Sequence, residues 1–308
     1  MRAAARTLSA PVTVAVYGRG GVGVSTTADA LTAAGVAVVD HDADIEVRVL
    51  AEVVKPEDRD ALADAHSPTV LIFNKADLAG LGAGGPMASA RRRCRQLAAT
   101  VGVPIEPLDA LVAVAAGRSG VLDEVLVEAL RTLVAEPADL SSPDAFVTGG
   151  HALSSQIRHR LVAVLDIFGI AHAVAALRRA PDCDAAALRA ILRRVSGIDE
   201  VCALLDAAAA EVRYRRSIPV LAGLQAMACA DDRVAGYLVS DDVVLARMAQ
   251  AAAVVGARPD RSGDPSVHTR RAVWWRDYAR GPVSELHRSC AGDIVRGSLR
   301  LLVAGGSR

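Results

Sequence analysis

The spacing of apolar residues changes once along the chain, and this change divides it into two parts. Between residues 12 and 140, short apolar runs such as 12–17, 36–39 and 69–73 alternate with stretches of helical spacing. This alternation predicts a mostly parallel β-sheet covered by helices. From residue 156 onward the apolar residues recur at helical spacing. The pattern therefore predicts an α/β domain followed by an all-α helical domain.

The predicted boundary is the segment 137–143, which is rich in proline and serine. A chain of 308 residues exceeds a typical single domain. We expect a flexible N-terminus over residues 1–11, the α/β domain over 12–140 and the helical domain over 144–304. Glycine and proline residues are expected to separate the later helices, and these breakers are Gly169, Pro181, Gly197, Pro219 and Gly256.

A glycine-rich loop follows the first predicted strand directly and leads into a helix. In such a loop, backbone N–H groups converge on phosphate oxygens at a helix N-terminus, where the helix dipole also favours negative charge. The alternative is a tight strand-to-helix turn that holds no ligand. The candidate phosphate-binding residues are Gly18, Arg19, Gly20, Gly21, Val22, Gly23, Val24, Ser25 and Thr26.

A second candidate element, Asn74-Lys75-Ala76-Asp77, ends the apolar run at 69–73. An aspartate carboxylate can accept two hydrogen bonds from the edge of a guanine base. Asparagine can anchor the loop, and the lysine stem can lie along the base. The alternative is a strand that runs into an Asn/Asp turn. Asn74, Lys75 and Asp77 are therefore candidates for guanine recognition.

The two elements, in this order, resemble the P-loop GTPase superfamily of the Era- and dynamin-like kind, in a shortened and degenerate form. The resemblance implies a P-loop NTPase domain, GTP or GDP as the ligand, and Mg²⁺ held by Ser25 and by Asp40 at the end of the strand 36–39. The stretch 115–123 is similar to the SAK-type loop of these proteins. It implies that the backbone of Ala115 and Ala116 contacts the guanine base.

The chain departs from the family pattern at the residues that serve hydrolysis. Val24 stands where the family has a lysine that reaches the phosphates, and the only lysines are Lys55 and Lys75. Arg19 is the nearest cation, at a position where the similar loops of chromosome-partitioning ATPases carry an extra lysine. After Asp40 the chain lacks the glycine that senses the γ-phosphate, and the segment before it is too short for a switch loop.

These departures favour a guanine-nucleotide-binding regulatory protein with weak or no hydrolysis. Such a protein would act through its helical domain on a protein partner, and one candidate is another GTPase in a homodimer or heterodimer. One alternative is an active GTPase in which Arg19 or a residue of the partner compensates for Val24. Another is an interaction module that binds no nucleotide.

Composition restricts the partners and the location. The chain has 35 basic and 35 acidic residues, which gives no reason to expect nucleic-acid binding. The apolar segment 161–177 contains Asp166 and His172, so a buried central helix is favoured over a membrane span. The first residues lack the apolar core of a secretory signal, which predicts a cytoplasmic protein. Near the end of the chain, Trp274 and Trp275 are expected to pack in the core or to anchor a partner.

Overall fold

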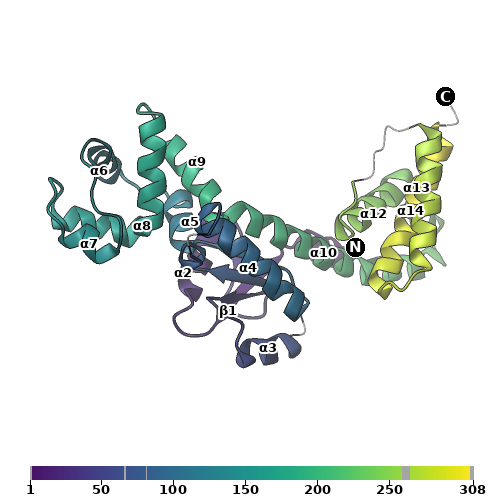
Figure 1. Ribbon diagram of the computed structural model, residues 1–308. Coiled ribbons are helices and arrows are strands. Elements are labelled where there is room, and N and C mark those ends of the chain that lie inside the picture. The colour runs from purple at the N-terminus through teal and green to yellow at the C-terminus, as the bar shows by residue number, and fades with distance from the viewer. Residues whose placement is uncertain (1, 66, 81, 259–263, 306–308) are drawn as a thin grey trace. The chain divides into compact units, whose positions relative to one another are not determined.

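The computed structural model describes residues 2–65, 67–80, 82–258 and 264–305. The chain forms two compact units, which are shown in Figure 1. The sheet unit spans Thr13–Leu205, and the helical unit combines Met1–Val12 with Asp206–Arg308. The division falls inside the long helix α10 (Ile198–Ala228).

The described residues of the sheet unit contain a five-stranded sheet in which all pairs are parallel. The strand order is β2-β1-β3-β4-β5. β3 lies in the middle, and Ile45, Val47 and Val49 are completely buried. The predicted parallel α/β fold is confirmed. The strands are β1 (Thr13–Gly18), β2 (Ala37–Val38), β3 (Ile45–Leu50), β4 (Thr69–Asn74) and β5 (Ile105–Leu108).

The chain reverses direction across the sheet at β1. It passes from β1 to β2 on one side and then returns to the other side of β1 for β3, β4 and β5. Because parallel crossovers are right-handed, α2 (Val24–Ala33) covers one face, and α3 (Pro56–Ala63) and α4 (Gly85–Val101) cover the other. The carboxyl ends of β1 and β3 therefore flank the position at which sheets of this kind bind ligands.

Five helices that follow the sheet share one hydrophobic core. Val112, Leu130, Phe146, Leu165 and Leu188 are all buried in it, and Figure 1 shows the last four of these helices grouped together. The helices are α5 (Ala110–Gly117), α6 (Glu124–Ala135), α7 (Pro143–Thr148), α8 (Ser155–Arg179) and α9 (Ala185–Ser196).

The predicted domain boundary between residues 140 and 144 is wrong. The segment after it is tied to the sheet, since the Asp109 N–H after β5 donates to the Ser196 carbonyl at the end of α9, at 2.9 Å. Apolar side chains of α8 and α9 also pack with those of α5 in one hydrophobic core. The proline- and serine-rich segment is therefore a connection inside one unit.

Helix α8 is the one helix in the described part of the chain that is long and apolar enough to cross a membrane. Leu161, Leu165 and Ile170 are fully buried in the core of the sheet unit. This agrees with the prediction of a buried central helix. The helix is interrupted at Asp166, whose φ of 50° and ψ of 179° are not helical. Gly169, a predicted breaker, instead lies within the helix close to α5.

The helical unit has its own core, in which Tyr214, Met248, Trp275 and Ile294 are buried. Its helices besides α10 are α1 (Arg2–Ser9), α11 (Asp232–Leu238), α12 (Asp241–Val254), α13 (Pro265–Ala279) and α14 (Glu285–Gly305).

The prediction of a flexible N-terminus is wrong, because most of residues 1–11 form α1. An Arg216 Nη1 hydrogen bond of 2.9 Å to the Ala10 carbonyl joins the segment to α10.

The two adjacent tryptophans of α13 have different surroundings. Trp275 is 7% exposed and belongs to the core, whereas Trp274 is 57% exposed. The Trp274 ring stacks on Tyr278, with 5.4 Å between the ring centroids. Trp275 therefore packs in the core, and Trp274 lies on the surface of the helical unit.

We predict that Phe146→Ala lowers the free energy of unfolding by about 3–5 kcal/mol, because it empties a fully buried position shared by α7 and its neighbours. Urea unfolding followed by circular dichroism measures this. Val125→Ala on the exposed face of α6 is the control and should change stability little. A similarly small effect of both changes would show that α7 is not part of the core.

Candidate functional site

The glycine-rich loop over residues 18–23 connects β1 to α2 and requires glycine at particular positions. Gly21 and Gly23 have φ values of 83° and 88°, which L-residues rarely adopt. A Cβ at Gly23 would lie 2.3 Å from Asn74 Nδ2, and a Cβ at Gly18 would lie 2.9 Å from the Val49 carbonyl oxygen. The loop is therefore packed closely against β3 and β4 and leads directly into the N-terminus of α2.

Asn74 joins this loop to the end of the sheet. Its Nδ2 donates to the Val22 carbonyl at 2.9 Å, and its Oδ1 accepts from the Ala110 N–H at 3.1 Å. The side chain is only 4% exposed. Asn74 thus occupies the anchoring position that the sequence predicts, and it brings the glycine loop, the end of β4 and the start of α5 together.

The space beside Gly18, at the start of the loop, is lined by apolar groups. A Cβ placed on Gly18 would lie 2.9 Å from a γ-methyl group of Val22 and 2.9 Å from one of Val24. Val24 begins α2, so its methyl groups approach the start of the loop. Val24 supplies no charge at this position.

Arg19, the nearest cation to the loop in the sequence, forms an ion pair outside the loop. Its Nε donates to Asp58 Oδ1 at 3.1 Å. Asp58 is buried in α3, where its other oxygen accepts the Lys55 N–H at 2.9 Å. The Arg19 side chain is therefore fixed on α3.

The residues assigned to magnesium are both exposed. Ser25 lies in the first turn of α2, and Asp40 follows the short strand β2. In the described ranges no hydrogen bond joins them. Asp44 Oδ2 accepts from the Thr13 N–H at 2.8 Å, which directs this acidic turn to the opposite end of β1. No group of three or more His, Cys, Asp or Glu residues able to hold a metal ion occurs in the described part of the chain.

The predicted loop over 115–123 begins too early. Ala115 and Ala116 lie inside α5, and Ala115 is fully buried, so neither is part of a loop. The reason is the N-cap at Asp109, whose Oδ1 accepts the Val112 N–H at 3.0 Å. The junction from strand to helix is therefore Asp109-Ala110, beside Asn74. An aspartate directly after an apolar strand is the sequence signal for this junction.

Three carboxylates influence one another through their charges near this edge of the sheet: Asp77, Asp109 and Asp166. Asp77 belongs to the short helix η1 (Ala76–Leu78). Burial raises the pKa of Asp77, and the negative charge of Asp166 raises it further. Burial also raises the pKa of Asp109 to about 7, with Asp77 and Asp166 adding to the increase and the Val112 N–H opposing it.

Asp109 and Asp166 both occupy energetically unfavourable positions. Asp109 Oδ2 is buried and has no hydrogen-bond partner among the described residues. Asp166 has backbone angles that normally require glycine, although its Oδ1 accepts the Ile167 N–H at 2.6 Å. Unsatisfied and strained groups of this kind are concentrated at functional sites. The sequence analysis did not identify Asp166 as a site residue. The one sequence feature that could have indicated it is a charged residue within the apolar segment 161–177.

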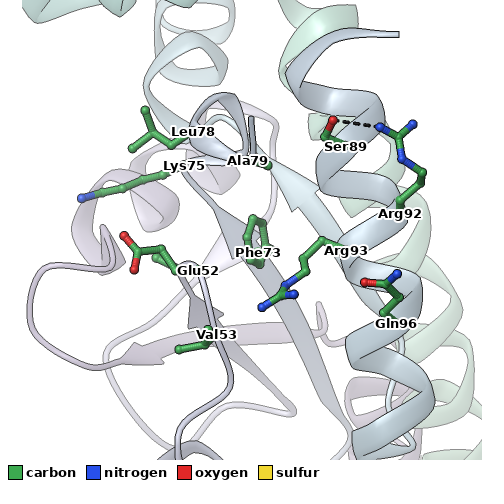
Figure 2. A pocket seen from close by; sticks show the side chains of 11 residues that line it. Glu52, Val53, Phe73, Lys75, Leu78, Ala79, Ser89, Arg92, Arg93 and Gln96 are labelled. Carbon is green, nitrogen blue, oxygen red and sulfur yellow. Dashed lines mark hydrogen bonds between the residues drawn. The ribbon is translucent and has the colours of Figure 1, made fainter. Parts of the chain in front are cut away.

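Lys75 has different surroundings from Asp77. It has a φ of 56° and lines a pocket of about 480 Å³ at the ends of β3 and β4. Figure 2 shows Lys75 and Glu52 on one side of this pocket, Arg93 on the other and Phe73 between them. Lys75 therefore lies across this pocket from α4, whereas Asp77 is influenced by the charge of Asp166 in α8.

Comparison with known proteins gives no relative: no family model, curated protein or solved structure matches the chain. The functional argument therefore depends on the geometry of the carboxyl edge. That edge combines a glycine loop, an anchored asparagine and a group of carboxylates.

We predict that Asn74→Ala lowers the free energy of unfolding by about 2–4 kcal/mol, because it leaves the Val22 carbonyl and the Ala110 N–H without partners. Hydrogen exchange in residues 18–23 should accelerate. Arg95→Ala on the exposed face of α4 is the matched control. Unchanged exchange in the loop would refute the anchoring role.

We predict that Asp109→Asn stabilises the fold more near pH 8 than near pH 5. The folded-state pKa of about 7 exceeds the ordinary 3.8, so the folded state binds more protons between these values and loses stability as pH rises. Asparagine removes this dependence and keeps the oxygen that caps α5. The gain should be roughly 2–3 kcal/mol larger near pH 8. Thermal unfolding at both pH values measures it, and an equal gain at both would contradict the assignment.

Proposed function

We propose that this chain is a guanine-nucleotide-binding regulatory protein, a shortened relative of the P-loop GTPases with weak or no GTP hydrolysis. The observation that carries the proposal is the pair of hydrogen bonds from Asn74 to Val22 and Ala110. They join the glycine loop to the element that contains Asp77. The reversal of strand order between β1 and β3 supports a ligand at the same edge.

In this proposal the N–H groups of the loop and of the first turn of α2 hold the phosphates. The Asp77 carboxylate accepts hydrogen bonds from the guanine edge when it is ionised. A magnesium ion would arrive with the nucleotide and contact the exposed Ser25 hydroxyl. Asp40 is also exposed, and no hydrogen bond in the described part of the chain joins it to Ser25.

Weak hydrolysis follows from the electrostatics of the loop. Phosphoryl transfer depends on positioned cations that stabilise the charge on the transferred group. Val24 supplies no charge, and Arg19 is held by Asp58. The chain would therefore bind nucleotide and act on a protein partner in the cytoplasm, such as a GTPase in a homodimer or heterodimer. The exposed Trp274 of the helical unit suits contact with a protein.

A second candidate function is an interaction module that binds no nucleotide. The methyl groups of Val22 and Val24 against Gly18 favour this alternative, because they occupy the inner side of the loop.

Titration calorimetry with GDP, GTP and ADP in the presence of Mg²⁺ separates the two functions. We expect binding of GDP and GTP but not ADP, and turnover of GTP at or near the uncatalysed rate. Asp77→Ala should abolish the preference for guanine, since the base edge then loses its acceptor. Val24→Lys should strengthen GTP binding by restoring the charge.

Asp60→Ala, on the exposed face of α3, is the control and should bind like the unmodified chain. The absence of heat with every nucleotide at millimolar concentration would reject nucleotide binding and leave the interaction module. Rapid turnover would reject the regulatory assignment.

A further inference from the structure

The helical unit contains a cavity of about 600 Å³ that the proposed nucleotide site does not involve. The end of α10 and helices α11, α12 and α14 line it. An adjoining hollow of about 560 Å³ shares Gln225, Arg247, Asp293 and Arg296 with it. Cavities of this size are typical of sites for small organic ligands.

One part of the cavity wall is apolar and incompletely packed. None of the residues of α11, all of which the structure describes, is buried, although Ala235 and Leu238 face the cavity. Val239 and Leu299, which also line it, are 62% and 47% exposed. Large apolar side chains that meet solvent around one hollow indicate that an apolar group binds there.

Another part of the wall is a buried polar network around Asp293, which is 3% exposed. The carboxylate accepts from Tyr214 Oη at 2.9 Å and pairs with Arg247 at 2.8 Å and Arg296 at 3.2 Å. Arg247 Nε is buried and finds no acceptor within the described part of the chain. The Arg247 side chain as a whole is still 23% exposed, so its accessible part can meet a ligand in the cavity.

The charges of the wall favour a ligand with one negative charge. Arg247, Arg296 and Arg300 line the cavity, and Asp293 is the only acidic residue that does so in the described part of the unit. Three positive charges and one negative charge leave an excess of two. Arg300 also pairs with the exposed Asp241 at 3.2 Å, which reduces the excess to one.

We propose that this cavity binds a fatty acid, with its carboxylate at Arg247 and Arg296 and its hydrocarbon chain beside α11 and Leu299. The lining residues of α14 run from Asp293 to Val303, a helix length of about 15 Å, which provides an elongated wall for the chain. A carboxylate is chosen because its charge and its two oxygens match the guanidinium groups of Arg247 and Arg296. The inference is independent of nucleotide binding.

Titration calorimetry of the full chain with dodecanoate, below its micelle concentration, tests the proposal. Dodecyltrimethylammonium has the same hydrocarbon chain with the opposite charge, and acetate has the head group alone. We expect dodecanoate to bind at least about tenfold more tightly than either, because charge-assisted hydrogen bonds and apolar burial are both required.

Two variants locate the binding. Ala235→Trp fills the apolar part of the cavity and should abolish dodecanoate binding while the melting temperature stays the same or rises. Arg296→Gln removes an exposed cation from the other part and should weaken binding about tenfold. Arg233→Gln changes an exposed arginine of α11 that does not line the cavity, and binding should be unchanged.

Three outcomes would overturn the proposal. Dodecanoate could give no heat, or it could bind no better than dodecyltrimethylammonium. Binding could also survive Ala235→Trp in a variant that circular dichroism shows to be folded. The alternative occupant is a second copy of the chain, and sedimentation equilibrium tests it. If the unmodified chain is a dimer that does not bind dodecanoate, and Ala235→Trp dissociates this dimer, the cavity is a dimer interface.

Discussion

The side chain of Asn74 is the constraint on which the carboxyl edge of the sheet depends. Its two hydrogen bonds fix the position of the glycine loop relative to α5, and they require that residue 23 has no side chain, because Asn74 Nδ2 occupies the space. An amide is suited to this task because it donates and accepts in one plane, and its burial makes both bonds necessary. The glycine loop, the end of β4 and the start of α5 meet because of this one residue.

The same edge carries several features that lower stability. Asp109 has a buried oxygen without a partner among the described residues, and Asp166 has strained backbone angles. Burial and the charge of Asp166 raise the pKa of Asp77. Groups of this kind are concentrated at functional sites. The glycine loop shows the opposite character, since the methyl groups of Val22 and Val24 lie close to Gly18. Recognition without efficient catalysis is the proposal that fits both features.

The two compact units carry separate possibilities for function. In the sheet unit, α8 and α9 complete the core beside the carboxyl edge, and α8 contributes Asp166 to it. In the helical unit, the network around Asp293 and the loosely packed α11 form a cavity with its own chemistry. Each can be tested in the full chain without reference to the other.

The sequence by itself determined the features that depend on neighbouring residues: the parallel sheet, the glycine loop between strand and helix, and Asn74 at the end of a strand. Longer-range features needed the tertiary structure. The end of α9 is hydrogen-bonded to the end of the sheet, so the boundary between the units lies later than the sequence predicts. Only the structure shows that Trp275 is buried in the core and that Trp274 is exposed. The cap at Asp109 placed Ala115 inside a helix, and Pro219 lies within α10 without ending it. Local patterns report backbone preference and periodicity. They do not contain the charge interaction between Asp77 and Asp166, which lie far apart in the chain and influence each other only because the helices pack together.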